Sequence, residues 1–266
     1  MRLCPGVPLA AYRLELGTHL VEAPLRGRKG GGVARIDLID TTEMYLKTIY
    51  EMVEDHVVPM RARIVERLGH SGPTVSQTVA RMERDGLVTV RGDRQLELTP
   101  EGLRLASGVM RKHRLAECLL ISVIGLDWVD AHDEACRWEH VMSRQVEDRI
   151  SVLLKDPETD PYGNPIPPAD RADEQVTLPA ALNPNERSLE SASAVAHQGT
   201  LRLTRIGEPI QAEPVLLKQI SAMGLRPGSV VSFESNGELS TIWTEGRASR
   251  LSIPPLFAPH LFGTLS

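Results

Sequence analysis

The stretch SGPTVSQTVARMERDG, residues 71–86, is the most informative part of the sequence for the fold of the first half of the chain. Ser71 is a typical helix N-cap, and Pro73 stands in the first turn, where its missing N–H costs no hydrogen bond. Apolar residues then recur at helical spacing. A second short helix is expected over MRARIVERLG, residues 60–69, and only a three-residue turn separates the two. This pattern predicts a helix-turn-helix.

The flanking sequence predicts a winged form of this motif. Apolar residues between Met44 and Val53 recur at helical spacing, so another helix precedes the pair. Downstream, LVTV and LELT alternate apolar and polar residues around the turn RGDR, which predicts a hairpin. We therefore expect a winged helix-turn-helix domain over residues 37–98. Eleven Lys/Arg against six Asp/Glu between Met60 and Arg114 favour an anionic partner such as nucleic acid, although the whole chain carries −5.

The rest of the chain predicts a mostly α protein with small β parts. One long apolar helix is expected from Thr99 to Gly125 and another over 129–154, and together they predict a helical dimerisation domain over residues 99–167. Residues 168–198 are expected to be a linker, since residues 155–198 hold seven prolines and few aromatics. Short strands divided by Gly and Pro turns then predict an antiparallel barrel over residues 199–266.

Residues 1–36 show no sustained period, and we expect a disordered extension or a mis-assigned start, with translation beginning near Val33. No run approaches the roughly 18 apolar residues of a membrane span, and the start is not that of a signal peptide. The three cysteines are odd in number and unpaired by spacing, which argues against a disulfide framework. We therefore expect a cytoplasmic protein with no membrane partner.

The stretch HDEACRWEH, residues 132–140, has the residue types and the spacing of a metal site. On one helix, its two histidines, Cys136 and Glu139 would share a face about 100° wide. His113 and Glu117, four residues apart, share a face of the preceding helix. A lone helical His or Glu is usually solvated, and a lone buried Cys usually only packs. Four potential ligands on one face are less easily accidental, and mixed N, S and O donors suit transition metals better than Mg²⁺ or Ca²⁺.

Five segments resemble the diphtheria toxin repressor family of iron-dependent bacterial regulators. In chain order they are DTTEMYLKTIY, SGPTVSQTVARMERDGLV, VMRKHRLAE, HDEACRWEHVM and YGNPIP. The resemblance covers Leu38 to Pro167 almost without gaps and is looser beyond, where that family has an SH3-like domain. It implies a homodimeric, metal-dependent DNA-binding repressor of iron-uptake, siderophore and iron-homeostasis genes, and not an enzyme.

The resemblance also implies two metal sites per subunit. The primary site would consist of Met44, Cys136, Glu139 and His140. The ancillary site would consist of His113, Glu117 and His132, joined by Glu208 and Gln211 from the motif GEPIQ. Members tuned to manganese carry a carboxylate where Cys136 stands, so the Met and Cys pair favours Fe²⁺, with Mn²⁺, Co²⁺, Ni²⁺ or Zn²⁺ as substitutes.

The helix from residue 71 would enter the major groove of double-stranded operator DNA with its N-terminal half. The base-contacting residues would then be Ser71, Pro73, Thr74, Ser76 and Gln77, of which Gln77 is the strongest candidate. Phosphate contacts are expected from Arg61, Arg63 and Arg94. An ordinary solvated charge is the alternative for each of these three arginines.

Three other functions fit parts of the pattern. The chain could be a manganese-responsive regulator of the same family. A zinc ion held by Cys, His and Glu could activate water for hydrolysis, but no separate general base or oxyanion donor stands out. Alternatively, Cys136 could be a redox sensor on the same DNA-binding module.

Overall fold

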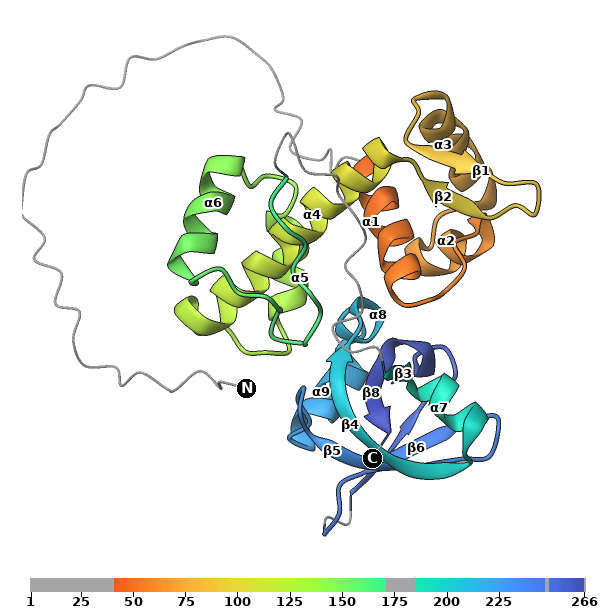
Figure 1. The fold of residues 1–266 in the computed structure, drawn as a ribbon, viewed down its shortest axis with the longest axis vertical. Helices are drawn as coiled ribbons and strands as arrows, with labels where there is room; N and C mark the ends of the chain where they lie inside the picture. Colours follow the sequence, from red (N-terminus) through yellow and green to blue (C-terminus); the bar gives the residue numbers. More distant parts are fainter. Residues whose placement is uncertain (1–40, 171–184, 247–248, 266) are drawn as a thin grey trace, which may run out of the picture. The chain divides into compact units, whose positions relative to one another are not determined.

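The computed structural model describes residues 41–170, 185–246 and 249–265 (Figure 1). The expected N-terminal extension, residues 1–36, and residues 171–184 of the expected linker lie outside the described residues. Among the described residues, no helix is both long enough and apolar enough to span a membrane. The fold class expected from the sequence, helical in the first part and antiparallel β in the last, is confirmed.

The first part of the described chain is a winged helix-turn-helix. Ser71 caps its recognition helix, since the Ser71 Oγ accepts a hydrogen bond from the Thr74 N–H at 3.3 Å. Gly69 ends the preceding helix in the left-handed conformation, with φ of 65°. The elements are α1 (Thr41–Glu54), α2 (Arg61–Leu68), α3 (Gly72–Arg84) and a hairpin of β1 (Val88–Val90) and β2 (Leu96–Leu98). The helix-turn-helix and its wing therefore form as predicted.

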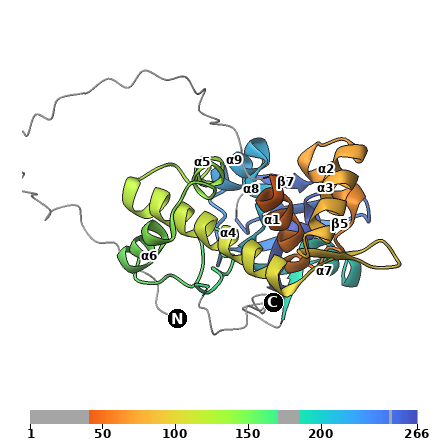
Figure 2. The same cartoon turned by 90° about the horizontal axis from the view of Figure 1, so that it is seen from above.

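The helical region that follows is built around one long helix, α4 (Pro100–Leu119), which packs against α1 and against the two later helices (Figures 1 and 2). Three further elements complete it: a π-helical turn (Leu120–Ile124), α5 (Ala131–Trp138) and α6 (Arg144–Leu153). The single helix expected over 129–154 was wrong, because Ser143 caps a new helix through the Val146 N–H. Glu139 and His140 consequently lie in the turn after α5.

The C-terminal part is a six-stranded antiparallel sheet in the order β3-β8-β4-β5-β6-β7. Two of its helices, α7 and α9, contribute apolar side chains to the same core. The elements are β3 (Glu186–Ser188), α7 (Leu189–Val195), β4 (Gln198–Ile206), α8 (Glu208–Gln211), α9 (Pro214–Ala222), β5 (Val230–Ser235), β6 (Ser240–Trp243), β7 (Arg250–Ile253), a 3₁₀ turn (Ala258–His260) and β8 (Leu261–Leu265).

The expected linker boundary was wrong at its C-terminal end. Residues 186–195 belong to the C-terminal fold, because β3 pairs with β8, with Glu186 opposite Thr264. Leu189 and Ala192 of α7 are fully buried in the core of the sheet. The partner strand lies more than 70 residues away along the chain, so the local sequence pattern of a three-residue strand carried too little information to predict it.

Candidate metal centre

Helices α4, α5 and α8 bring four of the predicted ancillary ligands together. The His113 Nε2 lies 2.8 Å from the Glu117 Oε1, one turn further along α4. The His132 Nδ1 of α5 lies 3.2 Å from both of these atoms, and the Gln211 Oε1 of α8 lies 3.0 Å from the His132 Nδ1. We call this group, His113, Glu117, His132 and Gln211, the histidine cluster.

The spacing of the histidine cluster fits a metal ion. Two donors bound to one ion at about 2.1 Å are roughly 3.0–3.4 Å apart in octahedral or tetrahedral geometry. The donors here are 2.8–3.2 Å apart, and their imidazole and oxygen ligands suit a transition metal. The Glu117 Oε2 is also buried without a hydrogen-bond partner in the described structure, as is the Glu208 Oε2. A buried carboxylate oxygen without a partner destabilises the folded state unless a cation binds to it.

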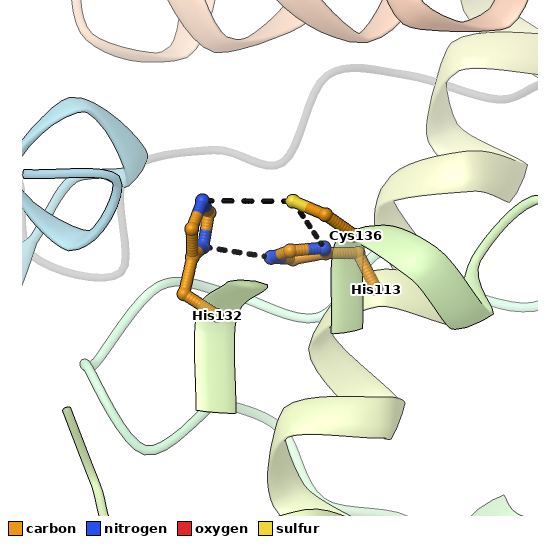
Figure 3. A group of neighbouring side chains, drawn as sticks. All are labelled: His113, His132 and Cys136. Atoms are coloured by element: carbon orange, nitrogen blue, oxygen red, sulfur yellow. Dashed lines mark hydrogen bonds between the residues drawn. The ribbon is translucent and has the colours of Figure 1, made fainter. Parts of the chain in front are cut away.

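A second group of donors adjoins the first. The Cys136 Sγ lies 3.6 Å from the His132 Nε2 and 3.9 Å from the His113 Nδ1, and Figure 3 shows these three side chains converging. One donor atom from each of the three lies within 4.8 Å of the others. The Glu139 Oε2 is 2.6 Å from the His113 Nδ1. The two predicted sites are therefore contiguous and meet at His113.

A lysine that was not among the predicted ligands lies among these donors. The Lys47 Nζ is 2.7 Å from the Glu139 Oε2, 3.1 Å from the His113 Nδ1 and 3.7 Å from the Cys136 Sγ. We call Lys47, Cys136 and Glu139 the cysteine cluster. A signal was available, because Lys47 follows Met44 by three residues and so shares its side of α1.

The remaining primary-site residues are placed differently. The His140 Nδ1 is 2.8 Å from the Glu43 Oε2 on α1, and its Nε2 is 3.2 Å from the Glu139 Oε1. Met44 is partly buried and packs against the apolar core of the winged helix. Its role as a ligand stays a prediction. Glu43, like Lys47, was not predicted, although it directly precedes Met44.

Mutual charge holds the cluster residues ionised. Burial opposes the thiolate, but Lys47, His132 and His113 lower the pKa of Cys136 well below its usual value. Burial likewise opposes the carboxylates, but neighbouring cations lower the pKa of Glu117 and of Glu139 to about 2. Burial would lower the pKa of His132, whereas Cys136 and Glu117 raise it to about 9. A metal ion would have to replace the imidazole protons.

Next to His113, a fully buried arginine joins three parts of the fold. The Arg114 guanidinium contacts both carboxylate oxygens of Glu54 on α1 and, at 2.6 Å, the Glu208 Oε1 on α8. Its Nε lies 3.7 Å from the Asp160 Oδ2. Glu208 is therefore paired with a side-chain cation, whereas the predicted ancillary site would use it as a metal ligand.

The predicted DNA-contacting residues lie on α2, α3 and the wing. Five of them are exposed at the N-cap or on the first turns of α3: Ser71, Pro73, Thr74, Ser76 and Gln77. Arg94 is exposed at the tip of the hairpin with φ of 70°. Arg61 and Arg63 are half-buried on α2, and Arg63 donates to the Val58 carbonyl. These positions leave the N-terminal half of α3 accessible.

Both helical regions match known family models. Residues 37–96 match the model described as iron dependent repressor, N-terminal DNA binding domain, and residues 99–168 match iron dependent repressor, metal binding and dimerisation domain. The diphtheria toxin repressor of Corynebacterium diphtheriae is 54% identical over 195 residues, which cover 73% of this chain and 84% of that protein. The chain belongs to the iron-dependent repressor family. The family is one of transcriptional repressors, as the sequence resemblance implied.

Other proteins similar to this chain support the same family assignment. The iron-dependent repressor IdeR of Mycobacterium tuberculosis is 66% identical over 131 residues, covering 49% of this chain and 57% of that protein. Among solved structures, a manganese-dependent transcriptional repressor in complex with manganese has a TM-score of 0.67 at 27% identity, covering 85% of this chain and all of that one. The IdeR of T. acidophilum has a TM-score of 0.66 at 25% identity, covering 87% of this chain and all of that one.

Proposed function

We propose that this chain is an Fe²⁺-dependent repressor that binds double-stranded operator DNA as a cytoplasmic homodimer, with two metal sites per subunit. Iron-uptake and siderophore genes are the proposed targets, following the family resemblance. The family itself contains metal-dependent transcriptional repressors with a DNA-binding domain and a metal-binding, dimerisation domain.

The observation that carries the proposal is a set of contacts that cross from α1 of the DNA-binding domain to the predicted ligands. Lys47 contacts Glu139 and Cys136, and Glu43 contacts His140. Any ion bound by Cys136, Glu139 or His140 would therefore lie at the boundary between the two domains. A change in charge there acts directly on α1, which packs against the rest of the winged helix.

Two sets of residues would hold metal. The ancillary set is His113, Glu117, His132, Glu208 and Gln211, and the primary set is Met44, Cys136, Glu139 and His140. Each set combines anionic and neutral donors. A divalent ion bound in each set would supply the positive charge that balances the anionic donors. The thiolate donor of Cys136 favours Fe²⁺ over Mn²⁺, because softer ligands prefer the later metals of the series.

Metal dependence follows if the bound ion favours one placement of α1. A preference of about 1–3 kcal/mol for the DNA-competent state raises operator affinity roughly 5- to 150-fold. Linkage requires operator DNA to raise the metal affinity by the same factor. The chain's own residues would thus convert metal occupancy into DNA affinity without any chemical reaction.

The DNA-binding role rests on the accessible half of α3. Ser71, Thr74, Ser76 and Gln77 carry exposed hydrogen-bonding groups there, and Pro73 offers an apolar contact for a thymine methyl. We assign base recognition to these side chains, above all to Gln77. Arg61, Arg63 and Arg94 would contact phosphates and fix the register without reading bases.

An exposed apolar surface supports dimerisation. Val123 and Ile124 of the π-helical turn are more than half exposed, and so are Val152 and Leu153 of α6. These two pairs of exposed apolar side chains favour a contact with another chain. A second copy would also supply the second recognition helix that a near-palindromic operator requires.

The proposal is tested by selecting duplexes from a randomised library with the full chain and Fe²⁺ under anaerobic conditions. The affinity of the selected duplex is then measured with Fe²⁺, Mn²⁺, Zn²⁺ or chelator by fluorescence anisotropy. We expect binding at least 5-fold tighter with Fe²⁺ than with chelator. Equal affinity in chelator would overturn the proposal, and activation by Mn²⁺ but not by Fe²⁺ would replace it with the manganese-responsive alternative.

A further inference from the structure

Lys47 is a buried cation with no role in the predicted sites. Only 6% of its surface is exposed, although an ammonium removed from water requires close partners of opposite charge or hydrogen-bond acceptors. It lies in the middle of α1, on the DNA-binding domain. Its partners lie on the other side of the domain boundary.

These partners are residues that would bind metal. The Lys47 Nζ lies 2.7 Å from the Glu139 Oε2 and 3.7 Å from the Cys136 Sγ, and also 3.1 Å from the His113 Nδ1. A protonated lysine has three donors and no acceptor, so it cannot itself ligate metal. A carboxylate and a thiolate oriented toward an ammonium cannot serve a divalent ion at the same place without strong repulsion between the two cations.

We propose that Lys47 is an internal cation that occupies the cysteine cluster in the metal-free protein, and that metal must displace it to bind there. Lys47 thereby sets the metal concentration at which this site fills. The inference rests on the proposed function, because it concerns the regulation of the same site. Lys47 would thus compete with metal for residues that bind it.

The displaced ammonium has a second partner within reach. Glu51 lies one turn further along α1, where residues four apart are neighbours, and it is 94% buried. Its carboxylate also contacts the Arg67 guanidinium at 3.2 Å. A modest movement of the flexible lysine stem can therefore transfer the ammonium from Glu139 toward Glu51 without exposing it to water.

A purely structural role for Lys47 predicts the opposite effect on metal affinity. If Lys47 only positioned Glu139 and Cys136, its loss would loosen these donors and weaken metal binding. If Lys47 competes with metal, its loss removes the competing charge and tightens metal binding. The sign of the change thus separates the two roles.

The test uses Lys47→Met, which keeps the length of the side chain and removes its charge. Full-length protein without DNA is titrated with Co²⁺ under anaerobic conditions, and the thiolate-to-cobalt absorption band that is lost in Cys136→Ala reports the ion bound by Cys136. We expect Lys47→Met to reach half-saturation at roughly tenfold lower Co²⁺ concentration than the unmodified chain. Lys218→Met, which removes the same charge from an exposed position on α9, should leave the titration unchanged.

Unchanged or weaker Co²⁺ binding in Lys47→Met overturns the inference. Thermal unfolding provides a second measurement, in which saturating Co²⁺ should raise the Tm of Lys47→Met more than that of the unmodified chain, and an equal rise counts against it. If Lys47→Met does not fold, the neutral Lys47→Gln replaces it with the same expectations. Failure of the unmodified chain to bind Co²⁺ overturns this inference and the proposed function together, whereas Co²⁺ binding without any effect on operator affinity overturns only the latter.

Discussion

The histidine cluster and the cysteine cluster meet at His113 but balance their charges in different ways. In the histidine cluster, imidazoles and oxygens lie at the spacing of metal donors, and one oxygen of Glu117 has no partner. In the cysteine cluster, the Lys47 ammonium already contacts the thiolate and carboxylate. The cations of the histidine cluster are therefore its own imidazolium groups, whereas the cation of the cysteine cluster is an ammonium supplied by the DNA-binding domain.

The largest expected effect concerns the cation that supports Glu208 beside the histidine cluster. Arg114→Met leaves the carboxylates of Glu54, Asp160 and Glu208 buried without their shared cation. We expect the free energy of unfolding to fall by about 3–5 kcal/mol, as for other buried ion pairs that lose one partner. Urea denaturation in the presence of chelator measures this change.

The matched control is Arg104→Met, which removes an arginine that pairs at the surface with Glu101 and Asp170. Exposed ion pairs contribute about 1 kcal/mol or less, so this variant should change stability little. An equal loss in the free energy of unfolding in the two variants would show that Arg114 stabilises the fold no more than a surface arginine does.

The next effect separates the cysteine cluster from ordinary thiol packing. Cys136→Ala removes the thiolate donor, and we expect the Fe²⁺ concentration for half-maximal operator binding to rise about 10- to 100-fold. Cys118→Ala is the control, because Cys118 is also buried and its thiol donates to the Thr159 backbone carbonyl. Fluorescence anisotropy with the selected duplex measures both variants, and an equal response would argue against Cys136 as a ligand.

A pH series distinguishes how the two clusters admit metal. His132 has a pKa raised to about 9 and is protonated at neutral pH in the metal-free protein, so metal binding must release this proton. The pKa of Cys136 is lowered, so its thiolate is already formed. The metal affinity of the histidine cluster should therefore rise from neutral pH toward the His132 pKa of about 9, by up to about tenfold per pH unit for each proton released.

Equilibrium dialysis of Met44→Leu with Co²⁺ at three pH values in this window measures the change, because this variant removes one proposed primary ligand but keeps Cys136, which raises the pKa of His132. Above about pH 9 the affinity should level off, because His132 no longer holds a proton to compete with the ion. Affinity that is flat or falls with rising pH in the window would contradict the assignment of His132 as a ligand.

The smallest effect concerns the C-terminal domain. Gln211→Ala removes the amide oxygen 3.0 Å from the His132 Nδ1, and we expect metal activation to weaken by a few-fold to about tenfold. Gln219→Ala, on the exposed side of α9, is the control and should behave like the unmodified chain. If Glu208→Ala and Gln211→Ala both leave activation unchanged, the C-terminal domain has no part in the metal response.

Several features of the site follow from local sequence alone. The spacing of four between His113 and Glu117, and between His132 and Cys136, places each pair on one helix face. Ser71 and Thr99 start α3 and α4 as predicted, because their hydroxyls accept the first free N–H groups of each helix. The recognition helix and these two pairs of donors were therefore predictable before any tertiary contact was known.

Other features depended on contacts between distant segments. Capping and periodicity act within a few residues, so α1 to α4, the wing and the donor types follow from local sequence. Three features required contacts between distant segments: the two donor sets meet at His113, β3 pairs with β8, and Gln211 reaches His132. The tertiary structure also decided the position of Lys47, since the balance of buried charge depends on which side chains three helices bring within a few ångströms.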